Sequence, residues 1–268
     1  MPQVVLVTGA SSGLGLAMAR HLSDRGYRVY GTSRNPASAA SGWSLIQLDI
    51  TRDDSVVKAI HHILEREGRL DVLINNAGMG IAGPVETCTD EEILSQFDIN
   101  FFGVARMCRA VIPAMRTARK GKIINISSIG GLMGLPYQGF YSTTKFALEG
   151  YSEALAMEVK PFGIQVSVIN PGDFATGFTA ARRVVLPSGN NPYRSSFEKT
   201  LSRIEQDENQ GADPKKLALL VDRIIRTKRP KFRYLAGRFD QRLMARLKPL
   251  LPPSLSKWIL INHYNLNR

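Results

Sequence analysis

The chain has few of the residues that bind metals or form disulfides. Its 268 residues include two cysteines, Cys88 and Cys108, and four histidines, with no H-E-x-x-H motif. Two cysteines are too few for a disulfide framework or a metal cluster, and their scarcity fits a reducing compartment. We therefore expect no metal site.

Long hydrophobic runs are also missing. No stretch approaches the roughly 18 apolar residues of a membrane-spanning helix. The segment Met1 to Thr8 has no cationic lead-in, and its apolar run is too short for a signal peptide. With 44% hydrophobic and 22% charged residues, the composition predicts a soluble, cytoplasmic, globular protein with a sizeable core.

Acidic residues are scarce in the last third of the chain. Lysine and arginine balance aspartate and glutamate over residues 1–180, so residues 181–268 carry the whole net charge of +12. The basicity is therefore a local property of this last third.

The N-terminal segment combines a short strand, a glycine-rich turn and a helix. The uniformly apolar run Val4–Val7 is typical of a strand buried on both faces of a parallel sheet. It leads into Gly9, Gly13 and Gly15, and then into a helical pattern of apolar residues. In this order, the glycines permit a tight turn, close approach of a pyrophosphate to the backbone, and close packing of helix on sheet. We predict a dinucleotide phosphate site here.

The second strand, from Tyr27 to Thr32, leads into Ser33 and Arg34. At this position NAD-binding folds usually carry a carboxylate for the ribose 2′-hydroxyl, whereas an arginine suits a 2′-phosphate. The pair therefore favours NADP(H), and the alternative is a solvated surface arginine.

Further strands are predicted over 45–50, 72–74, 123–126, 165–169 and 231–235, with helical patterns between most of them. This alternation predicts an α/β fold with a doubly wound, mostly parallel sheet. Ligands of such sheets bind outside the carboxyl ends of the strands, and every motif described here lies there or on the helix that follows.

A candidate acid–base pair lies in the helix predicted after the strand 123–126. Tyr141 and Lys145 are four residues apart, which places them on one helix face. A nearby ammonium stabilises a phenolate, so we expect Lys145 to lower the pKa of Tyr141 and make it a general acid/base. Ser128, at the end of the strand, is positioned to hydrogen-bond the substrate oxygen. Taken alone, the same spacing also fits an ordinary surface tyrosine and a solvated lysine.

These motifs together resemble the short-chain dehydrogenase/reductase family in its single-domain branch. The resemblance runs from about Val4 to Thr179, more loosely to Leu235. It rests on Thr8, Gly9, Gly13 and Gly15, on the N-N-A-G string 75–78, and on Asn100, Ser128, Tyr141, Lys145 and Pro171-Gly172. The stretches 83–86, 131–136 and 145–150 look more like the 17β-hydroxysteroid and retinol dehydrogenases.

The resemblance implies a Rossmann-type fold and assigns roles to residues. Tyr141 would exchange a proton with the substrate oxygen, Ser128 would polarise the carbonyl, Lys145 would bind the nicotinamide ribose, and Asn100 would hold a relay water. Asp49 would contact the adenine and Thr176 the carboxamide. The other implied cofactor-binding residues are Ser11, Ser12, Leu14, Ile50, Asn76, Ala77, Gly78, Pro171, Gly172 and Phe174. The substrate residues would be Ser128, Tyr141, Met133, Leu135 and Phe178.

We expect a single catalytic domain over residues 1–237 and a basic helical extension over 238–268. The insertion at about 173–213 reads as a substrate lid, because long insertions in compact domains are usually functional. Its aromatic residues, Phe174, Phe178, Tyr193 and Phe197, either line the pocket or hold the insertion to the core.

The basic extension allows three interpretations. It suits peripheral contact with an anionic membrane, a solvated basic face, or a tail packed against the pocket or another subunit. No recognition motif accompanies the charge, so we expect no nucleic-acid partner. The resemblance favours a homodimer or tetramer through the helices that carry Asn100 and Tyr141.

The sequence thus predicts an NADP(H)-dependent oxidoreductase that interconverts a hydrophobic ketone or aldehyde (steroid-, retinoid- or lipid-like) and its alcohol. The alternative is a non-catalytic NADP-binding regulator or scaffold of the same fold. A serine hydrolase is not supported, because no G-x-S-x-G motif is present.

Overall fold

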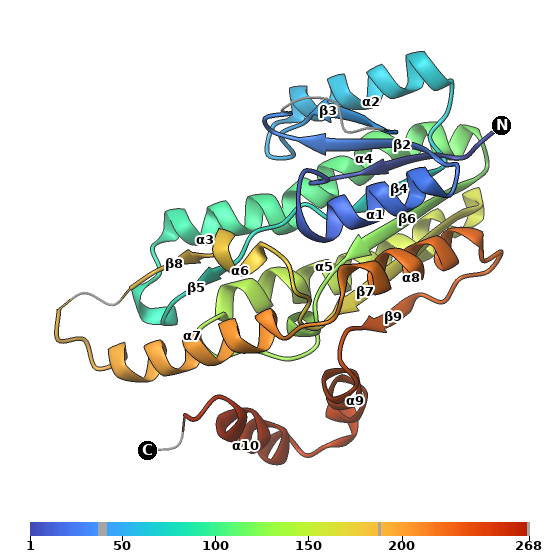
Figure 1. Ribbon diagram of the computed structural model, residues 1–268. Coiled ribbons are helices and arrows are strands. Elements are labelled where there is room, and N and C mark those ends of the chain that lie inside the picture. Colours follow the sequence, from blue (N-terminus) through green and yellow to red (C-terminus); the bar gives the residue numbers. More distant parts are fainter. Residues whose placement is uncertain (37–41, 187–188, 267–268) are drawn as a thin grey trace.

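A seven-stranded parallel sheet forms the centre of the computed structural model, which describes residues 1–36, 42–186 and 189–266 (Figure 1). The sheet order is β3-β2-β1-β4-β6-β7-β9, and all neighbouring strands are parallel. The strands are β1 (Val4–Val7), β2 (Arg28–Ser33), β3 (Ser44–Gln47), β4 (Val72–Asn75), β5 (Ile81–Ala82), β6 (Gly121–Ile126), β7 (Ile164–Pro171), β8 (Arg183–Val184) and β9 (Arg233–Ala236).

Helices cover both faces of this sheet. They are α1 (Gly13–Asp24), α2 (Asp53–Glu67), α3 (Asp90–Phe97), α4 (Gly103–Thr117), α5 (Gly139–Val159), α6 (Phe178–Ala181), α7 (Arg194–Asn209), α8 (Pro214–Arg226), α9 (Phe239–Leu247) and α10 (Pro253–His263). Short 3-10 or π turns are η1 (Val85–Thr87), η2 (Asp98–Phe102), η3 (Ile129–Gly131), η4 (Lys160–Phe162) and η5 (Lys248–Leu250).

The alternation of side chains along β1 explains the two layers. Val4 and Leu6 pack in the core beneath α2, α4 and α5, whereas Val5 and Val7 pack in the core beneath α1 and α8. Because both faces are buried, the strand is apolar at every position. The doubly wound Rossmann-type fold predicted from the sequence is confirmed.

The strand order reverses between β1 and β4, since the chain first adds β2 and β3 on one side and then β4 and β6 on the other. Such a switch point opens a crevice at the carboxyl ends of the strands, where ligands of open α/β sheets bind. The topology therefore positions the glycine turn after β1 next to the segment after β4.

Three local features differ from the sequence expectations. The helical pattern between the strands predicted at 72–74 and 123–126, which covers 91–115, is interrupted by the π turn η2 between α3 and α4. The third strand ends at Gln47 rather than Ile50. The insertion 173–213, expected to lack strands, contains β8, whose two residues pair with β5 a hundred residues earlier.

The last two helices extend below the sheet, apart from the layers that cover its faces (Figure 1). Gln241 of α9 ties them to the end of β7, because its side-chain oxygen accepts a hydrogen bond from the backbone N–H of Asp173 at 2.9 Å. Among the described residues, no helix has the length and apolarity that crossing a bilayer requires.

Candidate active site

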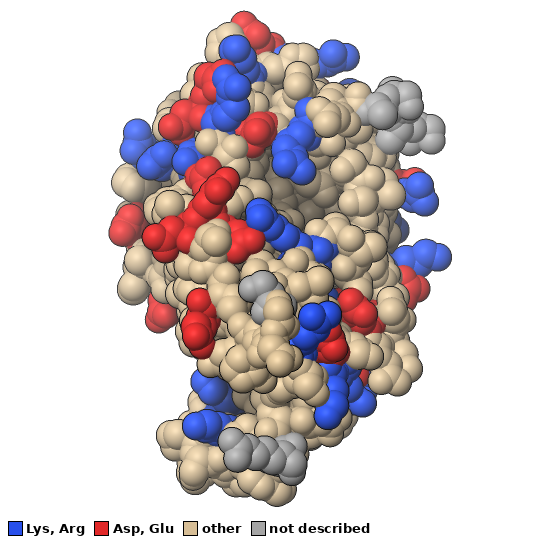
Figure 2. All heavy atoms as spheres, turned by 90° about the vertical axis from the view of Figure 1, so that its left-hand side faces the viewer, with Lys and Arg blue, Asp and Glu red and all other residues tan. Residues whose placement is uncertain are grey.

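One cavity of about 1670 Å³ runs along the carboxyl ends of the strands, from the glycine turn to α10. Figure 2 looks onto this side of the molecule and shows a hollow with basic side chains beside it. All but two of the site residues predicted from the sequence line this cavity, the exceptions being Asn100 and Gly15.

The glycine turn is shaped for a ligand that approaches the backbone. Gly9 and Gly13 have positive φ angles of +64° and +54°, which favour glycine. A Cβ on Gly15 would lie 2.1 Å from the carbonyl oxygen of Gly9, so Gly15 packs behind the turn instead of facing the cavity. Helix α1 begins at Gly13, and its N-cap Ser12 makes no side-chain capping bond. The first N–H groups of α1 are therefore available to a phosphate, and the turn fits a dinucleotide.

The adenosine end of the cavity is formed where β2 and β3 end. Ser33, the exposed Arg34 and Asp49 line it. Burial favours the neutral form of Asp49, but hydrogen bonds from Thr51 and the positive charge of Arg34 outweigh it and lower the Asp49 pKa. Asp49 is thus an anionic acceptor, and Arg34 is a cation without a salt bridge among the described residues.

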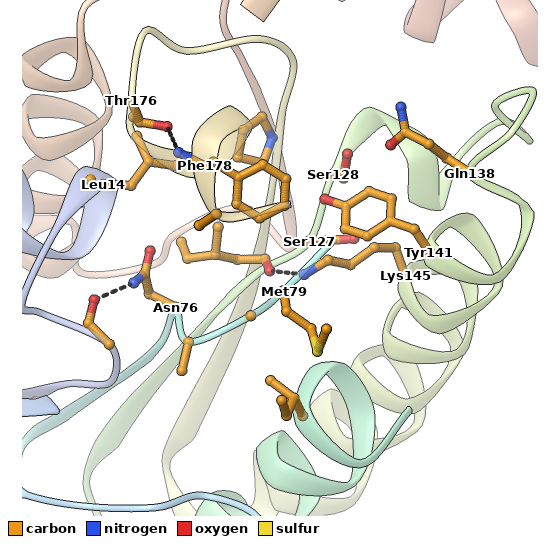
Figure 3. Close-up of a pocket in the computed structure, with 18 of the residues that line it drawn as sticks. Leu14, Asn76, Met79, Ser127, Ser128, Gln138, Tyr141, Lys145, Thr176 and Phe178 are labelled. Carbon is orange, nitrogen blue, oxygen red and sulfur yellow. Dashed lines mark hydrogen bonds between the residues drawn. The ribbon is translucent and has the colours of Figure 1, made fainter. Parts of the chain in front are cut away.

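Ser128, Tyr141 and Lys145 meet in the middle of the cavity (Figure 3). Tyr141 and Lys145 lie on the same face of α5, and Ser128 follows β6. The Lys145 ammonium donates to the backbone oxygen of Ile126 at 3.0 Å and lies 5.8 Å from the centre of the Tyr141 ring. A proton donor, a second hydroxyl and a buried cation therefore surround one point.

The expected lowering of the Tyr141 pKa is not observed. Burial raises the pKa of Tyr141 to about 12, and its hydrogen bond with Ser128 lowers it only in part. Burial also lowers the pKa of Lys145 to about 8, although Glu149 raises it. Desolvation is the largest cause of both shifts, because burial disfavours the charged form of each group. Tyr141 is thus protonated at neutral pH, as a proton donor must be.

Two asparagines brace the loops around this centre. Asn76 donates to the backbone oxygens of Thr8 and Gly9 at 2.9 and 3.1 Å, joining the segment after β4 to the glycine turn. Asn100, buried in the π turn, bonds both backbone groups of Met79 at 2.9 Å and donates to Thr144 at 3.2 Å. The Asn100 side-chain amide is already hydrogen-bonded within the protein and does not line the cavity. A relay water held by Asn100 therefore stays a prediction.

Beyond Ser128 and Tyr141, several large apolar side chains line the cavity. Met133, Leu135, Phe174 and Phe178 line it, and the Phe178 ring lies 6.2 Å from that of Tyr141. Three of the four lid aromatics take one of the two expected roles, whereas Tyr193 is exposed and does not line the cavity. Phe174 and Phe178 face the cavity, whereas the fully buried Phe197 packs on Tyr137 with ring centres 5.2 Å apart.

Several lining residues were not predicted from the sequence. Gln138 is only 6% exposed and lies beside Ser128 and Tyr141, with no hydrogen-bond partner for its amide among the described residues (Figure 3). One group comes from α7, α9, α10 and the residue after α10: Ile204, Asp207, Glu208, Asp240, Gln241, Met244, Ile259, Leu260, His263 and Tyr264. No local pattern marks them, since only the tertiary fold brings the C-terminal helices to the cavity.

Four carboxylates lie at this end, Asp173, Asp207, Glu208 and Asp240, and all but Asp173 are paired with a cation. Asp207 contacts Arg203 at 3.0 Å and His263 at 3.1 Å, and Glu208 contacts Arg182. Asp173 has no cation within 4.0 Å among the described residues and accepts a hydrogen bond from Gln241. Burial and the nearby Glu208 and Asp207 raise the pKa of Asp173 to about 6 against that hydrogen bond. Asp173 is therefore an anion at neutral pH that lines the cavity, and its nearest cationic influence is the more distant Arg238, which lowers its pKa in part.

Comparison with known proteins identifies the family to which these motifs belong. Residues 3–184 match the family profile of short chain dehydrogenases. The chain is 51% identical over 260 residues to a 3-ketodihydrosphingosine reductase of Bacteroides thetaiotaomicron, covering 97% of both chains. It is 33% identical to human 17-beta-hydroxysteroid dehydrogenase type 1, covering 97% of this chain and 84% of that one.

A solved short-chain dehydrogenase from Streptomyces avermitilis is similar in structure. The TM-score is 0.82 at 34% identity, with 98% of this chain and 97% of that chain covered. The chain therefore belongs to the short-chain dehydrogenase/reductase family, as an oxidoreductase that acts on CH–OH and ketone groups.

Proposed function

We propose that this enzyme uses NADPH to reduce the ketone of a long-chain amino alcohol, such as 3-ketodihydrosphingosine. The observation that carries the proposal is one continuous cavity that joins a glycine turn shaped for a phosphate, the Ser128–Tyr141–Lys145 centre, and an end with apolar side chains and the carboxylate of Asp173, which forms no salt bridge among the described residues. The substrate named for the Bacteroides relative has the matching parts: an amine, a ketone and a saturated chain.

The preference for NADPH is supported by Arg34. A 2′-phosphate on the adenosine ribose would find an unpaired guanidinium at the end of β2, with the Ser33 hydroxyl next to it. The carboxylate that usually selects the 2′-hydroxyl of NAD is missing there. Gly9, Gly13, Ser12 and Asn76 would hold the remainder of the dinucleotide.

The reaction requires a hydride at the carbonyl carbon and a proton at its oxygen. NADPH, when bound, supplies the hydride and is oxidised to NADP⁺. In our assignment Ser128 donates a hydrogen bond to the carbonyl oxygen, and Tyr141 transfers its phenolic proton to that oxygen as the negative charge develops. The buried Lys145 cation then stabilises the tyrosinate until a proton from solvent restores the phenol.

The amine of the substrate has a candidate partner in Asp173. A protonated amine next to the ketone would pair with this anion, and the unpartnered amide of Gln138 would bind the terminal hydroxyl. Met133, Leu135, Phe178 and Met244 would contact the alkyl chain. Steroids and retinoids carry no amine beside the reacting carbon, so this end of the cavity favours the amino ketone.

The proposed function also gives a role to each part of the chain. We propose that residues 1–237 form the catalytic domain, that 173–213 close over the substrate, and that 238–268 complete the pocket wall. The described residues exclude 187–188 of the insertion and 267–268 of the extension.

We also propose a homodimer or tetramer through α4 and α5. Phe102, at the end of η2 just before α4, and Met157 on α5 are exposed large apolar residues, 46% and 66% accessible. Lys248 of η5 lies 5.9 Å from the ring centre of Phe146 on α5, so the C-terminal region borders this surface.

A substrate screen tests the function. Purified protein with NADPH is offered 3-ketodihydrosphingosine, a ketone of the same chain length without the amine, a ketosteroid and retinal. We expect kcat/KM to be highest for the amino ketone. Preferred turnover of the steroid would contradict the substrate assignment, and NADPH binding without turnover of any ketone would favour the non-catalytic alternative.

A further inference from the structure

The outer side of the two C-terminal helices carries a row of exposed apolar side chains. We call this row the C-terminal face, and it consists of Phe239, Leu243, Leu247, Leu250, Leu255 and Trp258. The first four recur every three or four residues along α9 and η5, and the last two are three apart on α10, which places each set on one side of its helix. Leu250 is 80% exposed, Phe239 70% and Trp258 60%.

Exposed apolar residues are more clustered on the C-terminal face than elsewhere on the described surface. Seventeen large hydrophobic residues are exposed among the described residues, and six of them fall between residues 239 and 258. Single exposed apolar side chains are normal on soluble proteins, whereas clustered ones mark surfaces that bind something.

The charge around the C-terminal face has one sign. Arg242, Arg246, Lys248 and Lys257 lie on the same helices. The one acidic residue among described positions 239–266 is Asp240, and Arg238 binds both of its carboxylate oxygens, at 3.2 and 2.9 Å. In Figure 2 the lower end of the molecule, next to the grey terminal residues, is mainly tan with basic side chains at its edges.

Neighbouring side chains of the same helices form part of the wall of the cavity. Met244 of α9 and Ile259 and Leu260 of α10 line it. The wall is held by a few polar contacts, including His263 with Asp207 at 3.1 Å and the Thr200 hydroxyl with the backbone oxygen of Tyr264 at 3.4 Å. The helix pair thus separates the cavity from whatever contacts the C-terminal face.

We propose that the C-terminal face docks on the surface of an anionic lipid bilayer. Apolar side chains would enter the headgroup boundary while the flanking arginines and lysines contact lipid phosphates. A second copy of this chain is a poorer occupant, because a two-fold contact through this row would bring the same cations against one another. Docking sets the cavity wall at the lipid surface, next to the source of an apolar substrate.

The two tryptophans make this proposal measurable without a label. Trp43 is 9% exposed and Trp258 is 60% exposed, so a change of polarity at a bilayer alters mainly the emission of Trp258. The full chain is titrated with vesicles of equal parts phosphatidylglycerol and phosphatidylcholine, and with vesicles of phosphatidylcholine alone. We expect a blue shift and co-sedimentation with the anionic vesicles, at least tenfold weaker without anionic lipid or in molar salt.

Paired variants separate docking from a general loss of surface hydrophobicity. Leu250→Gln with Trp258→Gln removes two side chains of the C-terminal face, neither of which lines the cavity. Val57→Gln with Leu219→Gln removes two exposed side chains, 61% and 54% accessible, from α2 and α8. By co-sedimentation, the first pair should bind anionic vesicles at least tenfold more weakly, and the second should change binding less than twofold. Both should keep the wild-type rate with a short, water-soluble ketone.

Two results would overturn the proposal. One is a wild-type protein that neither co-sediments with anionic vesicles nor shifts its emission at low salt. The other is a wild-type dimer that the Leu250→Gln, Trp258→Gln pair converts to monomer in sedimentation velocity, with vesicle binding unchanged. That outcome would make the C-terminal face an interface between two copies.

Discussion

Replacing Arg34 by alanine tests the cofactor assignment most economically. The guanidinium is exposed and unpaired among the described residues, so its removal leaves no buried charge behind and does not disturb the fold. Its expected role is confined to the 2′-phosphate, which distinguishes NADPH from NADH. The substitution should therefore change one cofactor and spare the other.

The magnitude follows from the exposure of the site. A hydrogen bond to a charged group contributes about 1.5–3 kcal/mol in a protected setting. Arg34 is solvated, so screening reduces this value to about 1–2 kcal/mol. Because 1.4 kcal/mol corresponds to a factor of ten, we expect the Kd for NADPH to rise about 5- to 30-fold.

The assay is a fluorescence titration of wild-type and Arg34→Ala protein with NADPH and NADH. Arg66→Ala is the matched control, since Arg66 is an exposed arginine in the last turn of α2, at the opposite end from the cavity. Replacing Ser33 by aspartate should also weaken NADPH binding and strengthen NADH binding. A carboxylate repels the 2′-phosphate and accepts a hydrogen bond from the 2′-hydroxyl. Equal losses for both cofactors, or none, would refute the reasoning.

Two further predictions concern Asp173 and the glycine turn. Since Asp173 must be ionised to attract the substrate ammonium and its pKa is about 6, kcat/KM for the amino ketone should fall as pH drops below about 6. Asp173→Asn should remove that pH dependence and lower kcat/KM for the amino ketone about tenfold at pH 7.5, while kcat/KM for an amine-free ketone stays the same. An unchanged pH profile in this variant would exclude Asp173 as the partner of the amine. Gly15→Ala should cost more than about 3 kcal/mol or prevent folding, because its Cβ would lie 2.1 Å from the Gly9 oxygen. Gly150→Ala should stabilise the protein by about 0.5–1 kcal/mol, because Gly150 is mid-helix and no atom lies within 4 Å of a Cβ there. Urea unfolding measures both variants, and similar changes in their free energies of unfolding would contradict the prediction.

The parts of the fold that could be predicted are those set by local pattern. The strand–turn–helix over β1 and α1 has an apolar run, spaced glycines and helical periodicity in one continuous segment. Tyr141 and Lys145 share a helix face by spacing alone. These signals need no knowledge of distant residues.

The parts that were missed depend on distant contacts. Strand β8 has two residues, too few for any periodicity, and forms only because β5 lies beside it. Helices α9 and α10 were predicted, but their place in the cavity wall depends on contacts such as that of Gln241 with Asp173. A tail packed against the pocket was one of three interpretations of this region, and its composition could not select among them.

The protonation of Tyr141 and Lys145 could not be predicted from the sequence either. Spacing indicated that Lys145 and Tyr141 would be neighbours, which argued for a lowered phenol pKa. The sign depends instead on burial, which raises the pKa of Tyr141 and lowers that of Lys145. Burial of a side chain is a property of the whole fold.

The central claim is that the Tyr141 phenol delivers the proton to a ketone in the shared cavity. The most direct measurement compares Tyr141→Phe with wild type in NADPH binding and in reduction of 3-ketodihydrosphingosine. We predict an NADPH Kd within about twofold of wild type and a kcat reduced at least 100-fold, the low end for loss of a general acid. A phenylalanine variant that binds NADPH and reduces the ketone at the wild-type rate would contradict the account.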